Sequence, residues 1–252
     1  TLLRTLNLTH RLRAGHSPMI KLITFDLDNT LWDIDPVIIE AEKAMRLWVA
    51  EHVPEAVAQL EMDQLKQTYR HILNQHPEVA HHPTNFRKKL LYQVFTQVSL
   101  SHDHATEMSE KAFEVFYQGR NKITLFHQAE SILQALSKQY PLIALTNGNA
   151  NLGMIGIDGY FQAHFSSETE GKPKPHQAMF ERALSFGKVA AHEAIHIGDH
   201  PKEDVEAARK LGFNTIWFNE NGRQDPSLCT PTAEIHSLHQ LTAAVANIAA
   251  PG

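Results

Sequence analysis

The chain has 252 residues, of which 42% are hydrophobic, and this is enough for one large domain or for a core domain with a smaller insert. A formal net charge of -5 gives no electrostatic reason to expect a nucleic acid partner. The single cysteine, Cys229, excludes an intramolecular disulfide, and no apolar run reaches the ~20 residues that a membrane-spanning helix requires. We therefore expect a cytoplasmic protein without a nucleic acid or membrane partner, and the sequence does not indicate an oligomeric state.

Residues 1–18 contain three arginines but lack the apolar stretch of a secretory signal. Met19 stands directly before the first predicted strand. We therefore expect residues 1–18 to be an N-terminal extension or the result of a translation start upstream of Met19.

Short apolar runs recur along the chain with helical segments between them. The runs cover residues 22–25, 142–146, 194–198 and 214–218, with a weaker one at 234–237. Helical patterns cover residues 128–139, 177–186 and 203–211, and the last of these ends before Gly212. Strands that are apolar on both faces and alternate with helices predict a doubly wound parallel sheet in an α/β fold.

The stretch 33–125 interrupts this alternation. It has no convincing strand, and amphipathic helical patterns cover residues 36–51, 59–75, 85–99 and 106–117. We therefore expect an all-helical cap domain at residues 33–125, inserted into an α/β core that consists of residues 19–32 and 126–252. Residues 243–252 are rich in alanine and predict a terminal helix that frays.

Polar residues stand where the predicted strands end. Asp26 and Asp28 follow the first strand, Thr146 ends the second, and Asp199 follows the strand at 194–198. The carboxyl ends of parallel strands meet at one edge of a sheet, which is where ligands bind. We therefore expect these side chains to lie together, with Asp204 shortly beyond Asp199.

The residue types at this edge favour a phosphate ester and a metal ion. Several carboxylates suit Mg²⁺, a hard cation that prefers oxygen ligands. The hydroxyl of Thr146, the amides of the turn that follows it and the ammonium group of Lys174 are groups that hold phosphate. Together they predict a site for a phosphate monoester and not for a neutral substrate.

The same residues, in this order, resemble the motifs of the haloacid dehalogenase superfamily. The segment 26–30, Asp-Leu-Asp-Asn-Thr, resembles its first motif, and Thr146 and Lys174 match the second and third. Gly198-Asp199 with Asp204 matches the fourth, so that the resemblance covers residues 20 to about 241. It implies a Rossmann-like core, and the predicted helical insert stands where the superfamily places a small cap.

The resemblance also implies catalytic and metal-binding roles. Asp26 would be the nucleophile that forms an aspartyl phosphate, and Asp28 would protonate the leaving alcohol and later accept a proton from water. Asp26, the backbone carbonyl of Asp28 and Asp199 would bind Mg²⁺, with Asp204 and Thr30 in supporting positions. Asp204 could instead be an acid that is favourable in the first turn of a helix, and Thr30 could be a simple cap.

Four residues are implied to bind the substrate phosphate. These are Thr146 and Lys174 through their side chains, and Leu27 and Asn147 through their amides. Lys172 lies in the same loop as Lys174, but Lys174 precedes Pro175 and a helix as the family's lysine does, so we prefer it.

Histidine spacing suggests a different chemistry that we reject. Residues 192–196 match the zinc-protease pattern His-Glu-x-x-His, which requires both histidines on one helix. Because His196 falls in a predicted strand, the two imidazoles would stand about 13 Å apart, too far to share a zinc ion.

Several functions remain open at the level of sequence. A 2-haloacid dehalogenase needs no acid at the position of Asp28, because a halide leaves without a proton, so this function is disfavoured. A phosphomutase, a broad sugar or nucleotide phosphatase, and a non-catalytic binding module of the same fold remain alternatives. Segments 28–33, 36–38, 146–150 and 159–161 are also similar to the bacterial branch that dephosphorylates flavin mononucleotide and the ribitylaminouracil phosphate of riboflavin synthesis.

Overall fold

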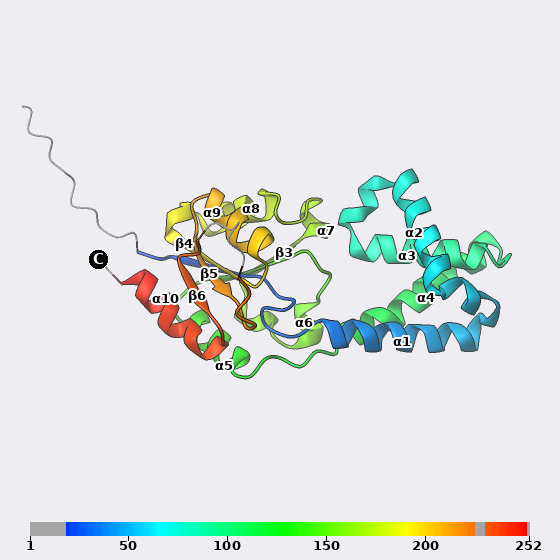
Figure 1. Cartoon of the computed structure of the whole chain (residues 1–252), viewed down its shortest axis with the longest axis horizontal. Coiled ribbons are helices and arrows are strands. Elements are labelled where there is room, and N and C mark those ends of the chain that lie inside the picture. The colour runs from blue at the N-terminus through cyan, green and yellow to red at the C-terminus, as the bar shows by residue number, and fades with distance from the viewer. Residues whose placement is uncertain (1–18, 225–229, 251–252) are drawn as a thin grey trace, which may run out of the picture.

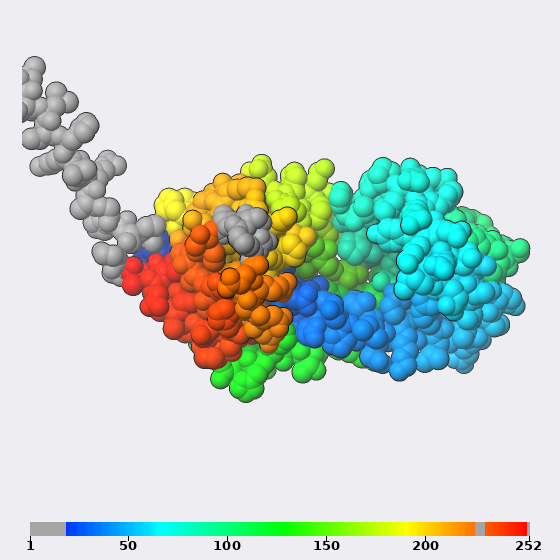
Figure 2. All heavy atoms as spheres, viewed as in Figure 1, coloured from blue at the N-terminus to red at the C-terminus, as the bar shows by residue number. Residues whose placement is uncertain are grey.

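The computed structural model describes residues 19–224 and 230–250 of the chain. The predictions for residues 1–18, for Cys229 and for the end of the C-terminal helix at 251–252 lie outside these residues. The protein has two lobes, one built around a parallel sheet and one purely helical (Figures 1 and 2). No helix in the described part of the chain combines the length and the apolar character needed to cross a membrane.

The sheet has six parallel strands in the order β3-β2-β1-β4-β5-β6. The strands are β1 (Leu22–Phe25), β2 (Leu142–Thr146), β3 (Ala163–Ser166), β4 (Ala194–Gly198), β5 (Asn214–Phe218) and β6 (Ala233–Ile235). Every residue of β1, β2 and β4 is buried, as expected for central strands covered on both faces. The predicted α/β fold with a doubly wound parallel sheet is confirmed.

Helices cover both faces of the sheet (Figure 1). Apolar side chains of α5 (Ala129–Ser137) and α10 (Leu241–Ala249) join one core cluster with Ile23 and Phe25. Those of α8 (Ala178–Gly187) and α9 (Ala207–Lys210) form another with Leu22. Because neighbouring residues of β1 point to opposite faces, the strand contributes to both clusters.

Strand β3 was not predicted from the sequence. It is an edge strand, paired only with β2, and only its last two residues are buried. Its residues His164 and Ser166 interrupt an apolar run, so the pattern of a strand buried on both faces is missing. The short helices α6 (Leu152–Ile155) and α7 (Ser167–Glu170), which flank β3, were also not predicted.

The helical lobe contains α1 (Asp35–His52), α2 (Met62–Gln75), α3 (Pro83–Thr96) and α4 (His102–Arg120). Its apolar side chains form a core cluster of their own, separate from the two clusters at the sheet. This agrees with the predicted helical cap, while the domain boundaries at residues 32 and 125 stay a prediction.

Two predicted helices differ in detail from the observed ones. The helix expected at 59–75 is divided into a 3₁₀ segment, η1 (Pro54–Leu60), and α2, because Glu61 between them has an extended backbone. The helix expected at 203–211 begins as a π-helical segment, η5 (Pro201–Glu206), and continues as α9. His192 lies in a 3₁₀ turn and His196 in β4. These two histidines therefore do not share a helix, as the zinc-protease pattern requires.

Candidate active site

The site lies where the strand order of the sheet reverses. Strands β1 and β4 are neighbours, and the chain proceeds from β1 toward β2 on one side and from β4 toward β5 on the other. Asp26 follows β1 and Asp199 follows β4, so both carboxylates stand at this switch point, where parallel sheets bind ligands. The amide of Asp26 donates to the carbonyl of Ile197 at 2.8 Å and thereby continues the pairing of the two strands.

Lys174 joins two of the predicted aspartates. Its ammonium Nζ lies 2.6 Å from Asp26 Oδ1 and 2.6 Å from Asp204 Oδ1, and the residue is only 3% exposed. Asn147 fixes the backbone of this lysine, because its Oδ1 accepts from the Lys174 amide at 2.7 Å and its Nδ2 donates to the Lys174 carbonyl at 2.9 Å. Lys172 is exposed, so Lys174 is the lysine of this loop that lies against Asp26.

Asp204 is a buried anchor for the lysine. Besides Lys174, its carboxylate accepts from the His200 amide at 2.9 Å and lies 3.1 Å from His196 Nε2. A Cβ atom on Gly198 would stand 2.3 Å from Asp204 Cγ, so only glycine at this strand end lets the carboxylate pack there. Asp204 therefore lies beside Lys174 and Asp26, while its supporting role at a metal site stays a prediction.

The acidic residues fit a divalent cation. Asp26, Asp199 and Asp204 each offer a carboxylate oxygen within 4.8 Å of the others. Since Asp204 is already bonded to Lys174 and His196, the oxygens best placed to bind a metal ion belong to Asp26 and Asp199. The hydroxyl of Thr30 lies between these two, 3.1 Å from Asp26 Oδ2 and 3.5 Å from Asp199 Oδ1. Its supporting role at a metal site stays a prediction.

The pKa shifts of the acidic residues and of Lys174 also indicate a cation site. Burial raises the pKa of Asp26 well above its usual range, although Lys174 opposes this, and burial with the nearby charge of Asp204 raises the pKa of Asp199 to about 6. Burial also acts on Asp204, but Lys174 and His196 outweigh it and hold its pKa below the usual range. Burial disfavours the charge of Lys174, yet the two aspartates it contacts raise its pKa overall. More negative charge is buried than one lysine neutralises, as expected of a cation site with hard oxygen ligands.

Asp28 is not part of this cluster, and its carboxylate faces two donors of its own. Arg120 Nη2 lies 2.8 Å from Asp28 Oδ2 and 3.1 Å from Oδ1, and Trp32 Nε1 donates to Oδ1 at 2.8 Å. The tight turn after β1 produces this direction, because Asn29 has a φ of 63° and its amide donates to the Trp32 carbonyl. Asparagine tolerates this left-handed conformation better than most residues.

Thr146 and the loop after it close the other side of the site. The Thr146 hydroxyl accepts from the Gly148 amide at 3.0 Å. A Cβ atom on Gly148 would lie 2.5 Å from Asp28 Oδ2 and 3.0 Å from Arg120 Nη2. The loop thus brings Thr146 and Asp28 together, and glycine is required for this close approach.

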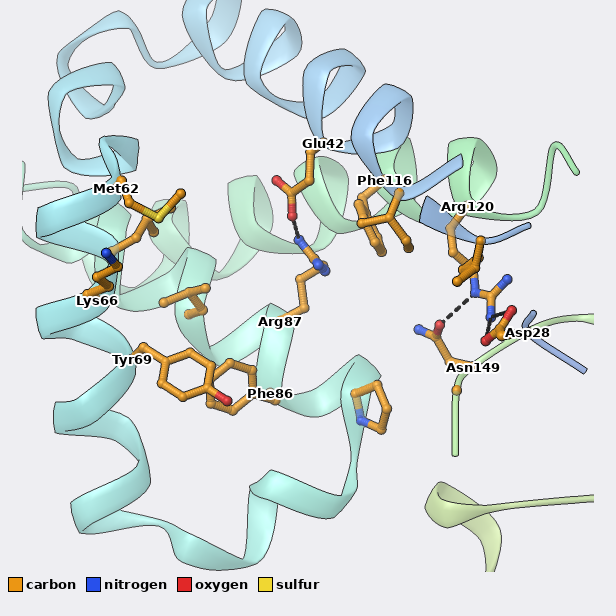
Figure 3. Close-up of a pocket in the computed structure, with 16 residues that line it drawn as sticks. Asp28, Glu42, Met62, Lys66, Tyr69, Phe86, Arg87, Phe116, Arg120 and Asn149 are labelled. Carbon is orange, nitrogen blue, oxygen red and sulfur yellow. Dashed lines mark hydrogen bonds and ion pairs between the residues drawn. The ribbon is translucent and has the colours of Figure 1, made fainter. Parts of the chain in front are cut away.

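A cavity of about 710 Å³ opens between Asp28 and the helical lobe (Figure 3). Apolar side chains from α1, α2, α3 and α4 line most of it, among them Phe86 and Phe116. The ring of Tyr69 meets that of Phe86 edge to face with centroids 4.6 Å apart. The Arg87 guanidinium lies 3.5 Å from the centre of the Phe116 ring and is paired with Glu42. The cavity therefore offers aromatic surfaces and a few charged groups next to Asp28.

Arg120 is the site residue that we did not predict from the sequence. It is the last residue of α4 and continues the buried stripe formed by Ala112, Phe113 and Phe116. A charged residue on an apolar helical stripe needs a partner, and this was the signal that could have singled it out. Trp32 is fully buried and also donates to Asp28.

Comparisons with known proteins agree with this geometry. Residues 20–212 match the family model of haloacid dehalogenase-like hydrolases. The chain is 30% identical to the 5-amino-6-(5-phospho-D-ribitylamino)uracil phosphatase YigB of Escherichia coli (strain K12), over 90% of this chain and 96% of that protein. It is 27% identical to the phosphoserine phosphatase of Thermus thermophilus, over 62% of this chain and 64% of that one.

A solved structure is also similar. The structure of a protein described as a 2-haloacid dehalogenase from Pseudomonas syringae pv. Tomato DC3000 superposes with a TM-score of 0.88 at 36% identity. The alignment covers 91% of this chain and 99% of that one.

Proposed function

Because the chain belongs to the haloacid dehalogenase-like hydrolase family, we propose that it is a magnesium-dependent phosphomonoester hydrolase that acts on a small phosphorylated metabolite. The observation that carries this proposal is the carboxylate of Asp28, which lines the cavity and is 22% exposed at its side chain. An alcohol leaves a phosphate ester readily only if a nearby acid protonates it. Asp28 and Glu42 both line the cavity, but Asp28 is two residues from Asp26 whereas Glu42 is paired with Arg87 in the helical lobe.

The proposed reaction has two steps. A carboxylate oxygen of Asp26 attacks phosphorus, an O–P bond forms, the ester P–O bond breaks, and Asp28 gives its proton to the departing alkoxide. Asp28 then accepts a proton from a water molecule that attacks the same phosphorus, which releases inorganic phosphate and restores Asp26. The Asp26 side chain is held for attack by Lys174 and Thr30.

The phosphoryl oxygens would be held by the Thr146 hydroxyl, the Lys174 ammonium and the amides of Leu27 and Asn147. Asp26, Asp199 and the backbone carbonyl of Asp28 would bind Mg²⁺. Bound Mg²⁺ supplies positive charge that stabilises the transferring phosphoryl group. The geometry supports this assignment, since Asp26, Asp199 and Asp204 offer carboxylate oxygens within 4.8 Å of one another, and burial together with the charge of Asp204 raises the pKa of Asp199.

We further propose flavin mononucleotide or a ribitylaminouracil phosphate as the substrate. The similarity to YigB supports this choice, and so does the cavity, whose volume and aromatic side chains suit a planar ring at the end of a polar chain. Tyr69, Phe86 and Phe116 would contact the ring, and the Glu42–Arg87 pair would meet its polar edge.

A phosphate-release screen with Mg²⁺ tests the proposal. The panel contains flavin mononucleotide, the ribitylaminouracil phosphate, a pyrimidine nucleotide, phosphoserine and a hexose phosphate. We expect release from at least the first two, with kcat/KM roughly tenfold or more above the others, which corresponds to about 1.4 kcal/mol in transition-state binding. A flat profile would contradict the substrate assignment, and an isomerised ester without free phosphate would indicate a phosphomutase.

Dehalogenation is the second candidate, because the similar Pseudomonas syringae structure is described as a 2-haloacid dehalogenase. In that chemistry the leaving halide takes no proton, so Asp28 would not be needed as a proton donor. Incubation with 2-chloropropionate separates the two functions. Release of chloride without release of phosphate from any ester of the panel would establish the dehalogenase instead.

A further inference from the structure

Arg120 lies in the helical lobe but is bonded to the site in the sheet lobe. It ends α4, is 1% exposed, and stands 92 residues from Asp28 in the chain. A guanidinium in such a place is costly unless its donors are used. Its Nε and Nη2 have partners, whereas Nη1 is buried and has none among the described residues. Its burial therefore calls for a specific partner, and that partner is Asp28.

The carboxylate of Asp28 is fixed from both lobes. Arg120 donates to both of its oxygens from α4, and Trp32 donates to Oδ1 from the turn after β1. Gly148 lies against the same carboxylate on the remaining side, where even one Cβ atom would collide with it. These contacts hold the carboxylate at the edge of the cavity, which Asp28 lines together with Arg120 and Asn149 (Figure 3).

Arg120 also forms a hydrogen bond with Asn149, which connects the two lobes. Its Nε donates to Asn149 Oδ1 at 2.9 Å, and Asn149 Nδ2 donates to the Thr84 hydroxyl at 3.2 Å. Thr84 belongs to the first turn of α3, and its hydroxyl donates to Glu168 Oε2 of α7 at 3.1 Å. A continuous series of hydrogen bonds therefore runs from the contact of α3 with α7 in the sheet lobe to the carboxylate of Asp28.

We propose that Arg120 is a positioning residue that aligns Asp28 for proton transfer to the leaving alcohol. Through the Asn149–Thr84 hydrogen bond, this alignment depends on the contact of α3 with the sheet lobe. This inference rests on the proposed phosphatase function. It assigns to Arg120 an effect on one step, the departure of the alcohol, and not on phosphate binding or on the metal site.

Substrates with different leaving groups isolate that step. The phenolate of 4-nitrophenyl phosphate leaves without a proton, whereas an alkyl phosphate such as the best metabolite of the screen requires one. We expect Arg120→Met to lower kcat/KM for the alkyl ester at least about tenfold more than for the aryl ester, within the range that general acid catalysis contributes. Arg120→Lys, which keeps one charged donor, should restore part of the loss.

A double-mutant cycle with Asp28→Asn shows whether Arg120 acts through Asp28. The single Asp28→Asn change should give the largest selective loss for the alkyl ester, and adding Arg120→Met should lower it no further. Arg70→Met, on the exposed surface of α2, is the matched control and should change neither ester. Thr84→Val should show a smaller loss with the same preference for the alkyl ester.

Several outcomes would overturn the proposal. Equal losses for both esters, no loss at all, or a full additional loss on top of Asp28→Asn would each show that Arg120 does not act by positioning Asp28. If Arg120→Met fails to fold, Trp32→Phe removes the other donor to the same carboxylate, and an equal effect on both esters would count against the idea as well. A wild-type protein that cleaves neither ester would instead refute the proposed function.

Discussion

Replacing Asp199 by asparagine should stabilise the metal-free protein. Burial and the neighbouring Asp204 raise the pKa of Asp199 from 3.8 to about 6, so the folded state binds this proton more tightly than the unfolded chain does. The folded protein is therefore penalised for carrying the charge. This penalty is absent below pH 3.8 and grows as the pH rises, until it is complete above about pH 6.

The size of the penalty follows from the shift. A difference of about two pKa units corresponds to about 3 kcal/mol at pH 7.5 and to roughly half of that at pH 5. Asparagine retains the shape of the side chain without the charge. It weakens the 3.5 Å hydrogen bond from Thr30 and removes the 3.8 Å ion pair with the half-exposed Arg223, which offsets part of the gain. We expect Asp199→Asn to raise the free energy of unfolding by about 1–3 kcal/mol at pH 7.5, or by roughly 2–4 °C in Tm for each kcal/mol.

Thermal unfolding at two pH values, with and without Mg²⁺, measures this effect. In the wild type, Mg²⁺ should raise Tm at pH 7.5 and have less effect at pH 5, where protons compete for Asp199. In Asp199→Asn the metal-free Tm should rise and the effect of Mg²⁺ should disappear. Glu181→Gln removes an exposed carboxylate from α8 and is the matched control. A metal-free Asp199→Asn protein that is less stable than the wild type at pH 7.5 would refute the reasoning.

Three further predictions concern the phosphate, the proton donor and the substrate. Lys174→Met should lower kcat/KM at least about a hundredfold and should lower the free energy of unfolding, measured in urea, by about 3–5 kcal/mol, because it leaves two buried carboxylates without their partner. Lys172→Met, at the exposed lysine of the same loop, should change neither quantity. Gly148→Ala should lower kcat for alkyl phosphates by displacing Asp28, with an unchanged increase of Tm in Mg²⁺, and an unaffected kcat would contradict the close approach. Phe86→Ala should raise KM about tenfold for a ring-bearing ester but not for glycerol phosphate, and equal changes in steady-state assays would place the ring elsewhere.

The sequence was sufficient for the central strands and for the residues at their ends. Strands β1, β2 and β4 are apolar throughout, and a parallel sheet necessarily brings their carboxyl ends together. The strand pattern therefore places Asp26 and Asp199 at the same edge of the sheet, and their proximity also depends on the pairing of β1 with β4, which the pattern does not show. Edge strand β3 escaped prediction because one of its sides is partly open to solvent, which relaxes the demand for apolar residues.

Contacts between the lobes could not be predicted in the same way. The amphipathic pattern of α4 shows which face is buried, but it does not show how the helix lies relative to the sheet. Arg120 meets Asp28 only because of that orientation, and the pattern offered just one sign of it, a charge on a buried stripe. The cavity residues Phe86 of α3 and Phe116 of α4 come from separate helices, and periodicity could not predict that they line one cavity.

Chemical identification of the intermediate tests the central claim most directly. The protein is mixed with Mg²⁺ and a phosphate ester that it hydrolyses, quenched in acid, and treated with borohydride, which reduces an aspartyl phosphate to homoserine. Peptide mass spectrometry should find homoserine at position 26 when both ester and metal are present and not when either is omitted. Hydrolysis of the ester with Asp26 unmodified, or with the modification at a different residue, would contradict the account.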